Sequence, residues 1–240
     1  MIPLRDENPT RTIPYVLYVI IALNIIVYLY NGALRPEGNP LNDYVLIPKA
    51  LTEGTRSGID TPISPWLTIF TSMFMHANIL HIAGNMLYLW IFGNNIEDVL
   101  GHFKFLFFYL AAGTAAALAQ VSLAPTSTVP MIGASGAIAG VLGAYLYLFP
   151  RARVITLIFI LVFIQVVALP AEVVLGLWIL LQVVNSLMMA ASGVNSSGGV
   201  AYAAHVGGFV AGIILIILFG GRRLLNGRRA VEYNRSGWLS

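Results

Sequence analysis

The chain has 240 residues, of which 58% are hydrophobic and only 10% are charged. Soluble domains carry roughly 25% charged residues, so this composition excludes a water-soluble globular protein and a disordered chain alike. The net charge is +3, and the basic residues lie mostly between apolar blocks, which argues against a nucleic-acid partner. There is no cysteine, so disulfides, cysteine-ligated zinc and thiol catalysis are excluded.

Seven apolar blocks follow one another, bounded by Pro, Gly, Asn or Arg. They cover residues 15–30, 79–92, 103–124, 131–149, 154–169, 171–190 and 200–219, and residues 31–65 form the one long polar stretch. The first block is predicted to be a retained helix rather than a signal peptide. Asp6 and Glu7 offset the basic start, and no small-x-small cleavage site follows the block.

The block 154–169 decides the topology. Its 16 residues would make about 24 Å of helix, which is short for a hydrocarbon core of about 30 Å, and Gln165 interrupts it. We expect it to lie along the membrane interface or to dip into the membrane. Six spans then remain, in one all-α membrane protein.

The basic residues orient these six spans, because cytoplasmic loops carry an excess of Lys and Arg. Both termini fall on one side, and ten basic residues lie there against three in the long first loop. The ten are Arg5, Arg11, Lys104, Arg151, Arg153, Arg222, Arg223, Arg228, Arg229 and Arg235, and the three are Arg35, Lys49 and Arg56. The prediction is a cytoplasmic segment 1–12, a six-helix domain 13–220 and a basic cytoplasmic tail 221–240.

Polar side chains inside the apolar blocks are candidates for function, because they are costly at membrane depth and usually face a cavity or a partner. The main ones are His76, His81, Asn85, Ser135 and His205. Gln120, Glu172, Gln182 and Asn185 are further candidates, several of them near block ends.

Ser135 and His205 each lie beside small residues spaced four apart. Such spacing is typical of close helix packing, and Ser135 by itself fits a packing role as well as a nucleophile. The pairs Gly136/Gly140 and Gly208/Gly212 are expected to face each other and to bring Ser135 and His205 together. With one span between them, the two helices are parallel, and both side chains lie at similar depth near the non-cytoplasmic face.

A serine becomes a nucleophile when a base removes its proton, and a neutral histidine can do so. No acidic residue lies at that depth, so the prediction is a Ser–His dyad. His81 and Asn85 are four apart on one helix face, where both can donate hydrogen bonds to an oxyanion. The five-residue spacing of His76 and His81 does not suit one helix face, so neither a metal site nor another cofactor is expected.

Three motifs resemble those of the rhomboid intramembrane serine proteases. They are His76-x4-His81-x3-Asn85, Gly133-x-Ser135-Gly136 and Ala204-His205-x2-Gly208-x3-Gly212, and Gly93-x3-Glu97 is also similar. The resemblance covers residues 66–220. It implies a six-helix bundle whose long first loop lies partly in the membrane.

The resemblance also implies roles for single residues. Ser135 would be the nucleophile and His205 the general base, with His81, Asn85 and the Ser135 N–H forming the oxyanion hole; Glu97 would be structural. Such enzymes cleave transmembrane helices of other proteins near the outer face, with small residues at the cut and helix-weakening residues beyond it.

The chain departs from the family pattern at two places. Many members have a Trp-Arg pair where this chain has Trp66 followed by Leu67. Some stack a Tyr on the catalytic His where this chain has Ala139, so what supports His205 stays open.

Two alternatives are a non-catalytic binder of transmembrane segments with the same fold and a small-solute transporter. Loss of Ser or His would mark the first, and repeat symmetry or broken helices the second. Neither sign is evident.

The expected partners are transmembrane protein substrates and the lipid bilayer, and the expected location is a prokaryotic plasma membrane.

Overall fold

The computed structural model describes residues 1–33, 41–160, 163–192 and 200–227. It is mainly helical, and six of the described helices have 14 residues or more. These are α1 (Tyr15–Ala33), α5 (Ile79–Leu100), α6 (His102–Leu123), α7 (Ser135–Leu148), α8 (Ala171–Ser192) and α9 (Tyr202–Leu218). Each begins within a few residues of one of the predicted spans.

Fewer helices than the six predicted are both long enough and apolar enough to cross a membrane. Among the described residues, α6 and α8 are long and apolar enough by length and composition. A third results if α9 and the helix Gly221–Gly227, bent from it by 53°, count as one span. The apolar parts of α1 and α7 are shorter. The six-span count therefore stays a prediction from the sequence.

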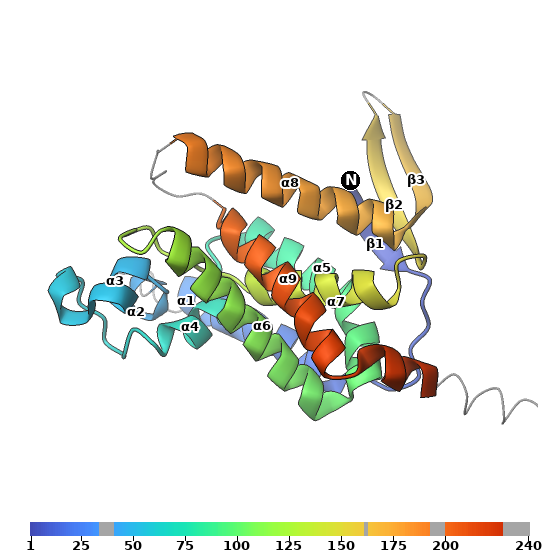
Figure 1. Ribbon diagram of the computed structural model, residues 1–240, viewed down its shortest axis with the longest axis horizontal. Coiled ribbons are helices and arrows are strands. Elements are labelled where there is room, and N and C mark those ends of the chain that lie inside the picture. The colour runs from blue at the N-terminus through green and yellow to red at the C-terminus, as the bar shows by residue number, and fades with distance from the viewer. Residues whose placement is uncertain (34–40, 161–162, 193–199, 228–240) are drawn as a thin grey trace, which may run out of the picture.

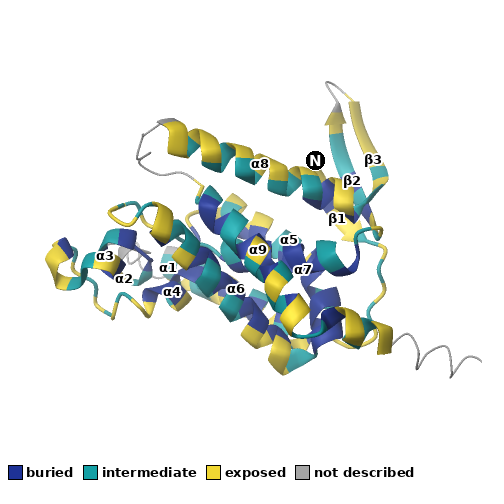
Figure 2. Ribbon diagram, in the orientation of Figure 1, coloured by how far each residue is buried: buried dark blue, intermediate teal, exposed yellow. Residues whose placement is uncertain are grey.

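Helices α6, α7 and α9 lie side by side at the centre of the molecule (Figure 1). Helix α7 is the most enclosed, and Figure 2 shows it largely in the colour of buried residues. Helix α8 contacts α9 along one side and leaves most of its surface exposed. The largest fully buried side chains fill the space between α5, α6 and α7, and include Phe92, Phe105, Phe108, Tyr109 and Tyr145.

The central helices touch backbone to backbone, because glycines face each other across the contact. A Cβ added to Gly208 would lie 2.2 Å from the carbonyl oxygen of Gly136, and one added to Gly212 would lie 2.0 Å from that of Gly140. The predicted facing pairs are therefore confirmed. Both pairs rise together in residue number, so α7 and α9 run parallel.

The polar stretch before α5 is folded onto the bundle. Its described part contains α2 (Leu41–Tyr44), α3 (Pro48–Glu53), α4 (Thr68–Thr71) and the 3-10 helices η1 (Gly54–Ser57) and η2 (Ser72–Phe74). Leu46 is fully buried and forms a β-bridge with Met131, just before α7. The first loop thus lies beside the beginning of α7, and residues 34–40 of it fall outside the described residues.

Two carboxylates at the end of α5 hold the start of α1. Glu97 is fully buried and accepts hydrogen bonds from the N–H groups of Val16 and Leu17, at 3.0 and 2.7 Å. Asp98 accepts from the N–H and the hydroxyl of Thr12. The first N–H groups of a helix lack partners within it and favour negative charge. Glu97 therefore has the structural position that was predicted.

The segment 154–169, expected to lie along the interface or to dip into the membrane, forms a β-hairpin. Strands β2 (Arg153–Ile160) and β3 (Phe163–Pro170) pair antiparallel from Arg153 opposite Pro170 to Ile160 opposite Phe163. Strand β1 (Ile2–Asp6) pairs with β2, which gives the order β1-β2-β3. The segment is rich in Val, Ile and Phe, which favour strands. The fold is therefore mainly helical with a small sheet, which corrects a strictly all-α description.

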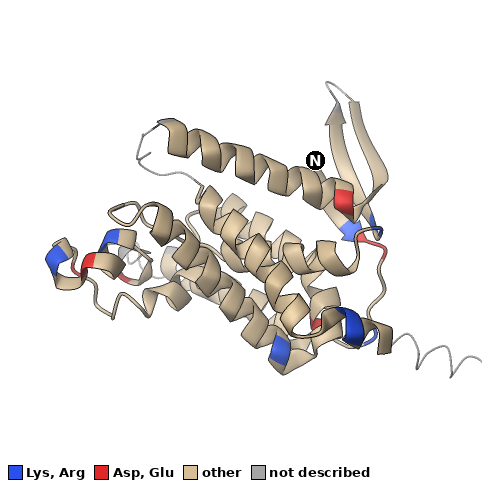
Figure 3. Cartoon of the chain, in the orientation of Figure 1, with Lys and Arg blue, Asp and Glu red and all other residues tan. Residues whose placement is uncertain are grey.

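The charges gather at two ends of the molecule (Figure 3). One end carries the short helices α2 and α3. The other carries the foot of the sheet, the turn between α5 and α6, and the end of α9. The helices between are almost free of charge, as expected for the part that a bilayer surrounds.

Asp6 provides a prediction for pH. Burial raises the pKa of this carboxyl from 3.8 to about 6, although a hydrogen bond from the Tyr145 hydroxyl, at 2.6 Å, opposes the rise. Between these values the folded chain keeps a proton that the unfolded chain has lost, so the stability contribution of Asp6 falls as pH rises from about 4 to 6. The Asp6→Asn variant should gain thermal stability relative to the wild type over this range. A difference in melting temperature between Asp6→Asn and the wild type that stays constant from pH 4 to 7 would contradict this.

Candidate active site

Ser135 is the first residue of α7 and follows a sharp turn. Gly133, two residues earlier, has a φ of +114°, a backbone conformation that glycine adopts readily. Its N–H donates to the carbonyl oxygen of Ser72, at 2.9 Å, which ties the turn to η2. Because the first N–H groups of a helix have no partner within it, the Ser135 side chain lies beside free backbone donors.

His205 approaches Ser135 from the first turn of α9. Its Nε2 lies 2.8 Å from the Ser135 Oγ, and its side chain is almost fully buried. On the other side of the ring, Nδ1 lies 2.8 Å from Oε1 of Gln182 in α8. The indole ring of Trp178, one turn earlier in α8, has its centroid 5.7 Å from that of the imidazole. The predicted Ser–His contact is therefore present, and the ring is enclosed by α8.

His81 and Asn85 reach the turn before Ser135 from the first two turns of α5. A Cβ added to Gly133 would lie 2.7 Å from Nε2 of His81 and 3.4 Å from Nδ2 of Asn85. The missing side chain of Gly133 thus leaves room for both nitrogens. The Asn85 amide also contacts Nε2 of His76, at 2.9 Å, which leaves its second amide hydrogen for another acceptor.

The arrangement joins a hydroxyl, an imidazole and several hydrogen-bond donors. A neutral imidazole that accepts from a hydroxyl can remove its proton, and two side-chain donors beside a helix start can hold an oxyanion. Within the described residues, no cluster of three or more His, Asp or Glu side chains could hold a metal ion.

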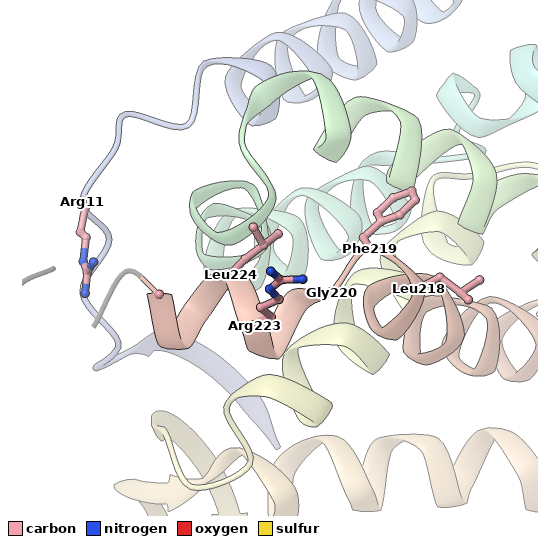
Figure 4. Close-up of a pocket in the computed structure, with 7 residues that line it drawn as sticks. Arg11, Leu218, Phe219, Gly220, Arg223 and Leu224 are labelled. Carbon is pink, nitrogen blue, oxygen red and sulfur yellow. The ribbon is translucent and has the colours of Figure 1, made fainter. Parts of the chain in front are cut away.

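Two cavities differ in their chemistry. A small one of about 40 Å³ borders Ser135 and is lined largely by small residues, among them Gly113, Ala116, Ala117 and Ala204. A larger, open one of about 770 Å³ lies at the far end of α9, between Arg11, Phe219 and Arg223 (Figure 4). None of the residues that line the larger cavity can act as a nucleophile or as a general base at neutral pH. Of the two, the small cavity is the one that borders a candidate nucleophile, Ser135.

Three contacts around the site were not predicted from the sequence. Gln182 was a candidate only as a polar residue in an apolar block, and Trp178 was not considered. Gln120 in α6 accepts a hydrogen bond from the N–H of Ala204, at 3.3 Å, which caps the start of α9 beside His205. The four-residue spacing of Trp178 and Gln182 puts them on one helix face, which is the signal that was available.

The chain is thus a helical bundle in which a serine and a histidine meet between two glycine-packed helices. A known family matches most of it. The Rhomboid domain model matches residues 64–222, and the chain belongs to this family of integral membrane proteins.

Several curated relatives carry the same name. The chain is 34% identical to the rhomboid protease GluP of Bacillus subtilis (strain 168), over 60% of this chain and 25% of that protein. It is 33% identical to the mitochondrial Rhomboid protein 1 of Saccharomyces cerevisiae, over 62% of this chain and 40% of that protein. A putative rhomboid protease of Bacillus subtilis, YdcA, is 28% identical over 60% of this chain and 69% of its own length. The matched part of this chain thus spans a quarter to two fifths of the first two relatives.

Proposed function

We propose that this chain is an intramembrane serine endopeptidase that cleaves the transmembrane helices of single-span proteins. The observation that carries the proposal is the 2.8 Å contact between Ser135 Oγ and His205 Nε2. Membership of a family of intramembrane serine proteases supports it.

The reaction is acyl transfer. Ser135 Oγ attacks the scissile carbonyl carbon while its proton passes to Nε2 of His205. The negative oxygen that forms is held by His81, Asn85 and the backbone N–H of Ser135. The C–N bond then breaks, and His205 returns the proton to the leaving amine. Water hydrolyses the resulting ester with His205 again as base, which restores Ser135.

The position of the site in the bilayer is inferred from charge. The Ser135 end of α7 lies beside the first loop, whereas its other end leads to Arg151 and Arg153, and the Arg222 guanidinium lies 4.3 Å from the Tyr147 ring. The basic end faces the cytoplasm by the positive-inside rule, and both termini with it. Cleavage then occurs near the outer face. Residues 228–240 of the predicted basic tail lie outside the described residues.

The proposed substrate preference is the one that the family resemblance implies, and two physical arguments support it. A helix must be opened locally before its carbonyls can be attacked, because they are hydrogen-bonded, so helix-weakening residues beyond the cut are expected. The cavity of about 40 Å³ beside Ser135 favours a small side chain at the cut. The bilayer that holds both partners is proposed to be a prokaryotic plasma membrane; the relatives include bacterial and mitochondrial proteins.

The proposal is tested with the purified protein in liposomes that contain a single-span substrate with a small residue near the outer face. Mass spectrometry of the products should locate one cut inside the apolar segment. A substrate that is bound but never cut would favour the non-catalytic alternative and overturn the proposal.

The oxyanion donors give a separate prediction. His81→Ala and Asn85→Ala should each lower kcat by about 10²-fold to 10³-fold, the usual cost of one oxyanion donor, with a smaller change in KM. Steady-state kinetics on the liposome substrate measures both constants. An unchanged kcat in both variants would remove these residues from the oxyanion hole.

A further inference from the structure

Gln182 is one of the few polar side chains on α8, whose exposed surface is mainly apolar. Seven apolar residues of α8 point outward with 42% or more of their surface exposed: Val173, Leu177, Leu180, Leu181, Val184, Leu187 and Met188. Gln182 instead turns toward α9, where its Oε1 meets Nδ1 of His205 at 2.8 Å. A hydrogen bond to a buried partner explains a polar side chain in this position better than solubility does.

The contact has a consequence for the protons of His205. A side-chain amide oxygen can only accept a hydrogen bond, so Nδ1 must carry the hydrogen of the neutral ring. Nε2 then holds the lone pair, and it is this nitrogen that lies 2.8 Å from Ser135 Oγ. The opposite tautomer would present an N–H to the serine and could not take its proton.

No carboxylate supports the imidazole, since the side-chain partners of His205 in the described part of the chain are Ser135 and Gln182. The indole of Trp178 in α8 also restricts the movement of the imidazole ring, since the two ring centroids are 5.7 Å apart. Rotation of the ring about its Cβ–Cγ bond would break both hydrogen bonds. The amide therefore fixes both the tautomer and the orientation of the base.

We propose that Gln182 is a positioning residue for His205. Ser135, His205 and Gln182 then form a chain of two hydrogen bonds, in which Gln182 holds the imidazole in place. The proposal rests on the proposed function, because it assigns Gln182 a part in the same reaction. The amide oxygen orients the ring before proton transfer and faces the positive charge that forms on it afterwards.

Kinetics of matched variants test the positioning role of Gln182. Gln182→Leu keeps the approximate size and removes the acceptor, and it should lower kcat about 10-fold to 100-fold, the loss of a hydrogen bond worth roughly 1–3 kcal/mol. KM should change less than about two-fold. Gln182→Glu keeps an acceptor oxygen at the same reach and should restore kcat to within a few-fold of the wild type. Asn185→Leu, which removes a polar side chain from the next turn of α8, should leave kcat unchanged.

A spectroscopic measurement tests the contact without reference to cleavage. Nitrogen NMR of ¹⁵N-histidine-labelled protein, with the signal assigned by its loss in His205→Ala, should show His205 as the Nδ1–H tautomer in the wild type. In Gln182→Leu it should show a mixture of tautomers.

The outcomes separate the two proposals. A wild-type protein that never cleaves overturns the proposed function, whereas the tautomer still reports on Gln182. If the protein is active and the kcat of Gln182→Leu is within two-fold of the wild type, the positioning role of Gln182 is overturned and the proposed protease function is unaffected. A kcat that falls equally in Gln182→Glu and Gln182→Leu also overturns the positioning role, as does the Nε2–H tautomer in the wild type.

Discussion

Replacing Ser135 with alanine is expected to lower the rate of substrate cleavage by at least about 10⁴-fold, to background. Removal of the hydroxyl removes the nucleophile, and the remaining donors cannot replace a covalent step. His205→Ala should cost about as much, because a serine without its base is a weak nucleophile and the two residues act as one unit. The measurement is the rate of product formation in liposomes.

The control for this experiment is Ser122→Ala, which removes an exposed hydroxyl near the end of α6 and should cleave at the wild-type rate. Thermal unfolding should show Ser135→Ala folded, because it deletes a single oxygen from the first turn of α7. Cleavage retained in a purified Ser135→Ala preparation would show that the hydroxyl is not the nucleophile.

Gly212→Val should destabilise the protein by at least about 3 kcal/mol, the upper range for overpacking a well-packed contact. The first atom of any side chain at this position would lie 2.0 Å from the carbonyl oxygen of Gly140, which belongs to the backbone and cannot turn aside. The helices α7 and α9 would have to separate, and with them Ser135 and His205. The free energy of unfolding, measured with denaturant, and the cleavage rate should therefore both fall.

Gly176→Ala in α8 is the matched control, because a Cβ there meets nothing within 4 Å. It should be neutral or stabilise the helix by up to about 1 kcal/mol. A Gly212→Val protein as stable as the wild type would contradict the backbone contact between α7 and α9.

The order of the helices could be predicted because it depends on long apolar blocks. The small-residue spacing also predicted which faces of α7 and α9 meet, and so the Ser135–His205 contact. The end of α5 could not be found this way. The apolar block ended at residue 92 because Gly93, Asn94 and Asn95 follow it. The helix nevertheless continues to Leu100 through Glu97 and Asp98. They are satisfied by the start of α1, a partner distant in the sequence.

The sheet escaped prediction for a different reason. A short apolar run is compatible with a strand or with a buried helix, and periodicity alone does not separate them. The pairing of Ile2 with Leu157 joins residues more than 150 positions apart, and no local pattern specifies it. The contact of Gln182 with His205 depends on the rotation of α8 about its axis. That rotation goes with the packing of Trp178 in α8 against Phe209 in α9, which the composition of α8 does not specify.

Covalent labelling tests the central claim most directly, because it requires only the nucleophile and its base. A fluorophosphonate probe should react with the folded wild-type protein in detergent or liposomes and add one adduct, which peptide mass spectrometry should locate on Ser135. Labelling should be lost in Ser135→Ala and strongly slowed in His205→Ala. An adduct on another residue, or equal labelling of the wild type and Ser135→Ala, would contradict the assignment of Ser135 as the nucleophile.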